Sequence, residues 1–241
     1  MMNLVSDMPS IRVSEHFFSV QGEGVSVGTP AIFIRLQGCN LNCGSQSGTW
    51  TCDTLDIWKK GTKYSVAEFA SIIHTDYQQA LNAGAHIILT GGEPLLQQAA
   101  VTALIQLLPS STRIEVETNG TILPEKALVS YVHYWNVSPK LQNSGEAACD
   151  RLKMDVLEWF AAQPHTIFKF VVNAASDIKE VKTSFPFVSQ LPLRQKFLMP
   201  AADTQGTLHK EYKTVIELAK THGFCLSQRL HLSVWDKTTG V

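Results

Sequence analysis

The 241-residue sequence has no apolar run of about 20 residues, the length that a membrane-spanning helix requires. It also has almost no excess charge. The formal net charge of −1 gives no indication of a surface for nucleic acid or membrane. The first ten residues lack the basic segment and apolar stretch of a secretory signal. These absences favour a cytoplasmic protein that binds neither nucleic acid nor a membrane.

Cysteine is scarce and unevenly placed. The chain has five cysteines, an odd number that argues against a framework of disulfides. Three of them fall within about fourteen residues, at Cys39, Cys43 and Cys52, whereas Cys149 and Cys225 stand alone. The cluster indicates metal chemistry, and we interpret the two isolated thiols as ordinary members of a loop and of a strand.

Apolar residues make up 44% of the chain, enough for a sizeable core, and no linker or repeat divides it. We therefore expect residues 1–241 to form one domain, with 44–51 as an inserted loop. Strands are predicted at 11–20, 31–36, 86–89, 113–118, 134–137, 166–172, 196–199 and 224–230. Helices are predicted at 65–84, 95–108, from 124, and at 155–161, 176–184 and 208–222.

Strands that alternate with helices form parallel sheets with right-handed crossovers. A complete barrel of eight units would need about 250 residues. The sequence offers about six such units, so the predicted fold is α/β, an incomplete (β/α) barrel. A doubly wound open sheet is the alternative, because periodicity alone does not separate the two.

The three clustered cysteines follow a buried strand, at the end where parallel α/β proteins place their sites. Three thiolates would leave one iron of a four-iron cluster open, whereas most electron-transfer clusters take four cysteines. An open position can bind a substrate or cofactor. A zinc site completed by His or Asp is the alternative, although no second short pair of ligands follows.

The segment Gly91-Gly92-Glu93-Pro94 directly follows the next buried strand. Two glycines allow a backbone to approach a ligand closely, and the Glu93 carboxylate would receive an ammonium group. The same residues also fit an ordinary turn from strand to helix. Their position after the cysteine cluster favours a ligand site.

Three cysteines after the first barrel strand and Gly-Gly-Glu-Pro after the second resemble the radical S-adenosylmethionine (SAM) superfamily. Further segments are similar to the 7-carboxy-7-deazaguanine synthase family: 18–24 (FSVQGEG), 28–30, 33–41, 52–54 (CDT), 117–121, 138–140 (SPK), 228–231 (QRLH) and Trp235. The usual superfamily spacing is C-x3-C-x2-C. Here a longer gap separates Cys43 from Cys52, and Cys52-Asp53-Thr54 still resembles the motif of the third ligand.

This resemblance implies a lyase that converts 6-carboxy-5,6,7,8-tetrahydropterin to 7-carboxy-7-deazaguanine with loss of ammonia, in queuosine and 7-deazapurine biosynthesis. It implies a 4Fe-4S cluster, S-adenosyl-L-methionine and Mg²⁺ as cofactors. It also implies a flavodoxin-like electron donor and a homodimer. An adenosyl radical would remove hydrogen from C6 of the pterin, and SAM would be regenerated.

The resemblance also implies binding roles for individual residues, and no catalytic residue is assigned. The metal ligands would be Cys39, Cys43 and Cys52 for the cluster and Thr54 for Mg²⁺. SAM would contact Thr51, Cys52, Asp53, Gly92, Glu117, Ser138, Pro139 and Lys140. The pterin would contact the backbone of Val20, Gln21 and Gly22, and the side chains of Glu23, Arg35, Thr90 and His231.

Three of these residues could instead have ordinary structural roles. Arg35 lies in an apolar strand and needs a counter-charge, which would be either the substrate carboxylate or a structural acid. His231 would be a core histidine, and Glu117 a solvated acid at a strand end.

Two other functions compete with the synthase. One is a radical SAM enzyme that places a glycyl radical on a partner protein, against which the Gln-Gly-Glu-Gly, Cys-Asp-Thr and Gln-Arg-Leu-His segments argue. The other is a structural metal-binding module, which predicts four protein ligands and no response to SAM.

Overall fold

The fold is described by a computed structural model of residues 9–44 and 47–241. The interpretation of the first ten residues as lacking a signal therefore falls mostly outside the described residues. Part of the predicted loop 44–51 falls outside them too. Among the residues described, no helix is both long and apolar enough to cross a bilayer.

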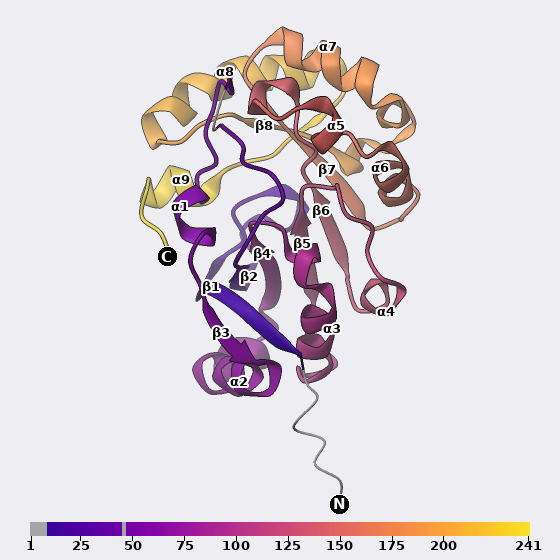
Figure 1. Ribbon diagram of the computed structural model, residues 1–241. Helices are drawn as coiled ribbons and strands as arrows, with labels where there is room; N and C mark the ends of the chain where they lie inside the picture. The colour runs from indigo at the N-terminus through magenta and orange to yellow at the C-terminus, as the bar shows by residue number, and fades with distance from the viewer. Residues whose placement is uncertain (1–8, 45–46) are drawn as a thin grey trace, which may run out of the picture.

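One sheet of nine strands runs through the molecule in the order β3-β1-β2-β4-β5-β6-β7-β8-β9 (Figure 1). The strands are β1 (Ser10–Val20), β2 (Pro30–Leu36), β3 (Thr62–Ser65), β4 (His86–Gly91), β5 (Ile114–Thr118), β6 (Tyr134–Val137), β7 (Thr166–Val172), β8 (Lys196–Pro200) and β9 (Cys225–Leu226). Neighbours from β2 through β9 are parallel, whereas β1 pairs antiparallel with β2 and β3. The parallel strands follow chain order without the reversal that defines a doubly wound sheet. The prediction of an incomplete barrel is confirmed.

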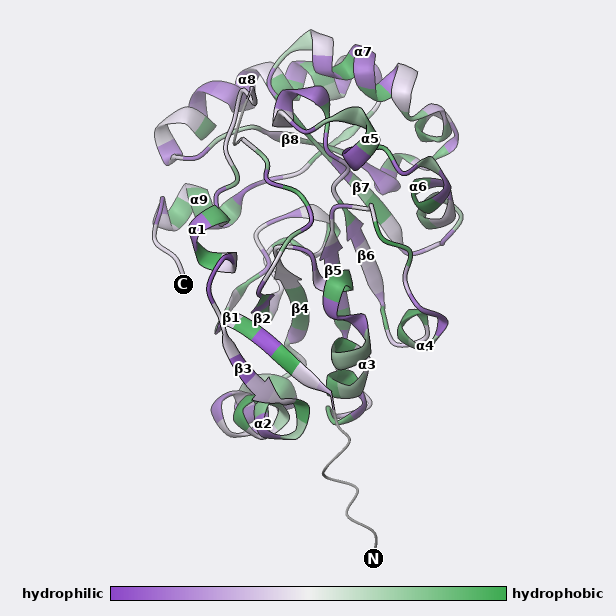
Figure 2. Cartoon of the chain, in the orientation of Figure 1, coloured by the Kyte–Doolittle hydropathy of each residue, from purple (hydrophilic) through white to green (hydrophobic). Residues whose placement is uncertain are grey.

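Helices cover the outside of this curved sheet (Figure 1). They are α1 (Leu55–Trp58), α2 (Val66–Asn82), α3 (Gln98–Gln106), α4 (Lys126–Val129), α5 (Ala148–Arg151), α6 (Met154–Ala161), α7 (Ala175–Ser184), α8 (Gln205–His222) and α9 (Leu230–Trp235). Figure 2 shows both hydrophobic and hydrophilic residues on α2 and α7, as expected for helices with one buried face.

Helix α2 begins as its sequence predicts. The Ser65 hydroxyl accepts from the Glu68 N–H at 3.2 Å, and the Glu68 carboxylate accepts from the Ser65 N–H at 3.4 Å. Val66, Phe69 and Ile73 are fully buried, so the apolar side of this helix packs into the core.

The two faces of the barrel strands carry different residues, and β7 shows the pattern. Phe168, Phe170 and Val172 belong to the apolar core under the helices. The alternate residues Lys169 and Val171 face a cavity inside the barrel. This alternation places polar groups inside the barrel without disturbing the core.

The predicted strand 224–230 is wrong over most of its length. Only Cys225–Leu226 forms a strand, and the chain then turns into α9, which begins at Leu230. The Leu230 N–H donates to the Gly22 carbonyl at 3.0 Å, so a distant loop redirects the segment. The short elements β3, α1 and α5 were also missed, and Cys149, expected in a loop, lies in α5.

Candidate active site

A cavity of about 860 Å³ opens at the carboxyl ends of the parallel strands. Its walls include the predicted residues Val20, Gln21, Gly22, Glu23, Arg35, Cys39, Cys43, Thr51, Cys52, Asp53, Thr54, Thr90, Gly92, Glu117, Ser138, Lys140 and His231. Pro139 is the predicted site residue that is not part of this wall. Residues 236–241 also line the cavity. The fold therefore gathers groups that are up to about 200 positions apart in the sequence.

The three clustered cysteines are free thiols that share this cavity. Burial raises the pKa of Cys39 to about 11 and also raises that of Cys43. These two groups would therefore bind as thiolates only beside a compensating positive charge, such as that of bound iron.

No three His, Cys, Asp or Glu residues in the described ranges are grouped tightly enough to hold one metal ion. The sulfurs are therefore not arranged as the ligands of a single tetrahedral zinc.

The gap between the second and third cysteines does not separate them in space. The Cys52 N–H donates to the Cys43 carbonyl at 3.3 Å and closes the base of the intervening loop. Next to this closure, the Gly44 N–H donates to the Ser144 carbonyl at 2.8 Å. The backbone is therefore closed at the base of this segment, and Thr49, Trp50 and Thr51 line the cavity together with the thiols.

The far side of the loop is fixed by Trp50, which the sequence analysis did not single out. Its indole N–H donates to Asn143 Oδ1 at 2.9 Å, and its ring lies 5.8 Å from Lys140 Nζ. Lys140 also donates to Ser138 Oγ at 3.1 Å. These contacts place a cation at the cysteine side of the cavity.

The two glycines after β4 let that strand end press against the backbone that leads into Cys39. A Cβ added to Gly92 would lie 1.9 Å from the Gly38 carbonyl oxygen, and one on Gly91 would lie 2.3 Å from that of Leu36. Real Cβ atoms do not approach backbone this closely. The glycines therefore allow two strand ends to pack closely together, in addition to any role in ligand binding.

Glu93 plays a different part from the one expected. Its carboxylate is fully buried and accepts from the Asn119 N–H at 2.7 Å, the Thr118 hydroxyl at 2.9 Å and the Leu95 N–H at 3.1 Å. It ties the end of β4 to that of β5 and does not face the cavity, so it is not placed to receive an ammonium group.

We expect Gly92→Ala to weaken both the fold and the cluster site, because the added methyl collides with the Gly38 carbonyl beside Cys39. Overpacking of this kind costs about 1–3 kcal/mol or more of unfolding free energy. Thermal unfolding and the iron content after reconstitution measure the two effects. Gly206→Ala is the matched control, because its Cβ meets only Thr204 Oγ1 at 3.9 Å. Wild-type iron content in Gly92→Ala would contradict the expectation.

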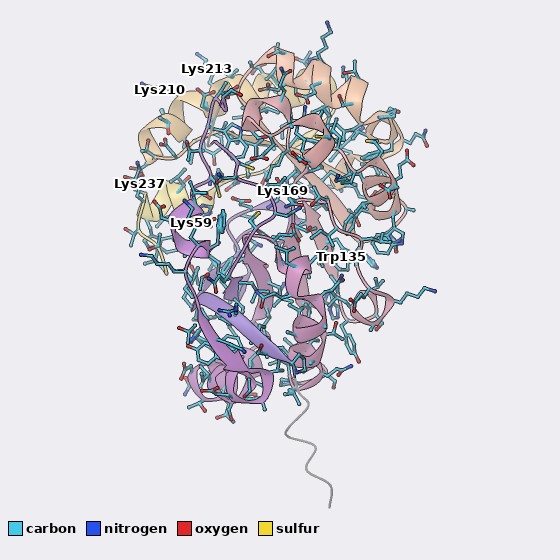
Figure 3. All side chains as sticks on the ribbon, in the orientation of Figure 1. Lys59, Trp135, Lys169, Lys210, Lys213 and Lys237 are labelled. Atoms are coloured by element: carbon cyan, nitrogen blue, oxygen red, sulfur yellow. The ribbon has the colours of Figure 1, made fainter. Side chains whose placement is uncertain are left out.

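At the other side of the cavity a buried lysine joins two acids. Lys169 Nζ lies 2.7 Å from Glu23 Oε2 and 3.6 Å from Glu117 Oε1. Figure 3 shows Lys169 near the centre of the molecule. Burial alone would raise the pKa of Glu23, but Lys169 and Arg229 outweigh it and lower the pKa to about 2. Glu23 is therefore a permanent anion at neutral pH.

Sequence reasoning missed Lys169, although a signal was present. The strand TIFKFVV is buried at every position and contains a single charged residue, Lys169. A lysine at such a position needs acidic partners. The pKa of Lys169 is raised, because Glu117 and Glu23 outweigh the opposing effect of burial.

Glu117 lies among residues predicted to bind substrate, although the resemblance assigned it to SAM. Its carboxylate accepts from Gln21 Nε2 at 3.2 Å and from the Thr90 hydroxyl at 3.4 Å. The Gln21 backbone pairs with 28–29 instead: its N–H donates to Thr29 O and its carbonyl accepts from Gly28 N–H. Gln21 therefore offers its side chain, rather than its backbone groups, to a ligand in the cavity.

Arg35 has the structural acid that the alternative interpretation required. Its Nε donates to Glu15 Oε1 at 2.8 Å, and the guanidinium still lines the cavity. This bond uses one of the five N–H groups of the guanidinium. The ion pair thus orients Arg35 without preventing it from binding an anion.

His231 lies in the first turn of α9 and packs directly against Gly22. A Cβ on Gly22 would lie 2.6 Å from His231 Nδ1, so a larger residue would displace the imidazole. His231 belongs to the cavity wall rather than to the apolar core.

Curated relatives of this chain belong to one family, and a family model and a solved structure match it as well. A family model described as a 4Fe-4S single cluster domain matches residues 20–131. The 7-carboxy-7-deazaguanine synthase of Pyrobaculum aerophilum is 34% identical over 98% of this chain and 100% of its own length. That of Halobacterium salinarum is 33% identical over 95% and 92%. The crystal structure of QueE from Escherichia coli shares the fold, with a TM-score of 0.67 at 23% identity over 92% of this chain and 95% of that one.

Proposed function

The chain belongs to the 7-carboxy-7-deazaguanine synthase family, and we propose that it converts 6-carboxy-5,6,7,8-tetrahydropterin to 7-carboxy-7-deazaguanine with loss of ammonia. It is a radical SAM lyase of 7-deazapurine biosynthesis. One observation supports the assignment most: the three thiols and the residues predicted to bind pterin face the same cavity.

The cysteine side of the cavity suits the cofactors. When bound, the 4Fe-4S cluster and SAM supply the one-electron chemistry that generates an organic radical. Cys39, Cys43 and Cys52 hold the cluster, and the Thr54 hydroxyl, 3.5 Å from Cys52 Sγ, offers oxygen to Mg²⁺. We assign SAM binding to Thr51, Cys52, Asp53, Gly92, Ser138 and Lys140 on the cavity wall, and to Pro139, which is not part of that wall.

The opposite side suits the pterin. Glu23, held as an anion, accepts from the paired N–H groups of the aminopyrimidine edge. Arg35 binds the carboxylate through N–H groups not used by Glu15. Thr90 and His231 line the remaining wall, together with the Val20–Gly22 segment. We extend the substrate set to Glu117, because it hydrogen-bonds Gln21 and Thr90.

Three finer features belong to the same proposal. Open edges at β3 and β9 leave backbone groups that a second copy would cover, which supports a homodimer. The family resemblance supports a flavodoxin-like electron donor. Five free cysteines support a reducing, cytoplasmic setting.

The test is an anaerobic assay of the reconstituted protein with SAM, Mg²⁺, a reductant and the tetrahydropterin, read by mass spectrometry. We expect 7-carboxy-7-deazaguanine. If SAM is cleaved to 5′-deoxyadenosine without this product, the substrate is wrong and a protein substrate becomes the next candidate. If SAM stays intact in a loaded and reduced sample, the structural metal module is favoured instead.

A further inference from the structure

Arg229, between β9 and α9, connects three segments that are distant in the sequence. One terminal nitrogen donates to Asp53 Oδ2 and the other donates to the Ala202 carbonyl. Nε lies 3.5 Å from Glu23 Oε1. The residue is 6% exposed, so these partners surround a buried cation.

Two of these partners belong to different segments of the cavity wall. Asp53 directly follows Cys52, the third cluster ligand, whereas Glu23 carries the carboxylate placed against the pterin. One planar guanidinium therefore contacts both the segment 52–54, here called the cluster loop, and the segment 20–23, here called the pterin loop. Lysine has a single ammonium and would not make these divergent contacts at once.

The contact to Glu23 is incomplete. Among the described residues, Arg229 Nε is one of the few buried polar atoms without a hydrogen-bond partner. A buried N–H without a partner costs free energy, so a small shift of Glu23 towards Arg229 would be stabilising. Glu23 is also held by Lys169 at 2.7 Å, so its carboxylate has two competing cations.

We propose that Arg229 is a positioning residue that couples pterin binding at Glu23 to the placement of the cluster loop through Asp53. A ligand that fixes Glu23 fixes the guanidinium, and the guanidinium fixes the residue next to Cys52. Coupling between two binding sites is reciprocal. Bound pterin therefore favours binding of the cluster by the same free energy by which the bound cluster favours binding of the pterin. The inference rests on the proposed function for the identity of the pterin.

The test follows iron release from the loaded protein to a chelator, with and without 6-carboxytetrahydropterin, under anaerobic conditions without reductant or SAM. In the wild type we expect saturating pterin to slow iron release severalfold, because the bound pterin holds the residue next to Cys52 through Arg229. In Arg229→Met the ratio of the two rates should fall to about one. Arg229→Lys keeps the charge but loses the planar guanidinium with its several donors, so its ratio of release rates should lie between these two values.

Arg151→Met is the matched control for loss of a buried arginine. Arg151 is also 6% exposed and pairs with Glu180 at 2.8 Å, but it is not part of the cavity wall. We expect it to lower the melting temperature while the protection by pterin persists. If Arg229→Met does not fold, Asp53→Asn interrupts the same connection and should also abolish protection.

Two results would overturn the inference: no protection in the wild type, or full protection in Arg229→Met. Failure of the proposed function looks different, because then the assay yields no 7-carboxy-7-deazaguanine. A wild type that makes the product yet shows no protection contradicts the coupling alone.

Discussion

Replacing Cys52 with alanine is expected to remove the cluster and with it both SAM cleavage and product formation. Cys39, Cys43 and Cys52 are the cysteines that line the cavity, so two thiols would remain to hold four irons. The Cys52 N–H already reaches the Cys43 carbonyl, so the backbone should keep its course while the ligand is lost. Iron and sulfide per chain, visible absorbance and product by mass spectrometry measure the effect.

Cys149→Ala provides the comparison, because Cys149 is exposed and is not part of the cavity wall. It should load iron and form product as the wild type does. A Cys52→Ala protein with full iron and normal product would show that the third ligand lies elsewhere, and the interpretation of Cys52-Asp53-Thr54 would fall.

Lys169→Met is expected to destabilise the protein strongly and to weaken pterin binding. The substitution leaves Glu23 and Glu117 facing each other in the cavity without the cation between them. Removing one partner of a buried ion pair costs about 3–5 kcal/mol. Urea unfolding measures the loss of stability, and equilibrium dialysis measures the loss of pterin affinity. Lys169→Arg keeps the charge and should recover most of the stability.

The loss of stability in Lys169→Met should depend on pH, and the titration of Glu23 determines whether it grows or shrinks in acid. Its pKa is lowered from 4.5 to about 2 in the folded protein, so its ionised form stabilises the fold fully above pH 4.5. That contribution is lost as the pH falls from 4.5 towards 2. Without Lys169 the pKa of Glu23 rises, so less of this contribution exists to be lost. The stability gap between wild type and Lys169→Met should therefore narrow in acid, and a constant gap would contradict this account.

Local patterns predicted most of the fold. The strands Tyr134–Val137 and Thr166–Val172 fall where the sequence placed them, because a short apolar run bounded by polar residues is a local signal. The segment 224–230 failed because its end is determined by tertiary contact, the hydrogen bond from Leu230 to Gly22. No periodicity within seven residues contains that information.

The functional site, like the fold, was predicted only in part. Motifs predicted the residues that line the cavity but not the groups that hold their charges. Glu15, Lys169 and Arg229 were not assigned roles, although each pairs with a residue that was. The charged residue inside an apolar strand could have revealed Lys169. The contacts of Arg229 could not be predicted from local sequence, because they join three segments that come together only in the folded chain.

The closed base of the loop after Cys43 has a consequence for how such proteins are found. Because the Cys52 N–H meets the Cys43 carbonyl, the two cysteines are neighbours in space although residues 44–51 separate them in the sequence. In general, the entropic cost of closing a loop rises by only about 0.6 kcal/mol for each doubling of its length. Sequence searches that demand a fixed cysteine spacing will overlook relatives of this chain.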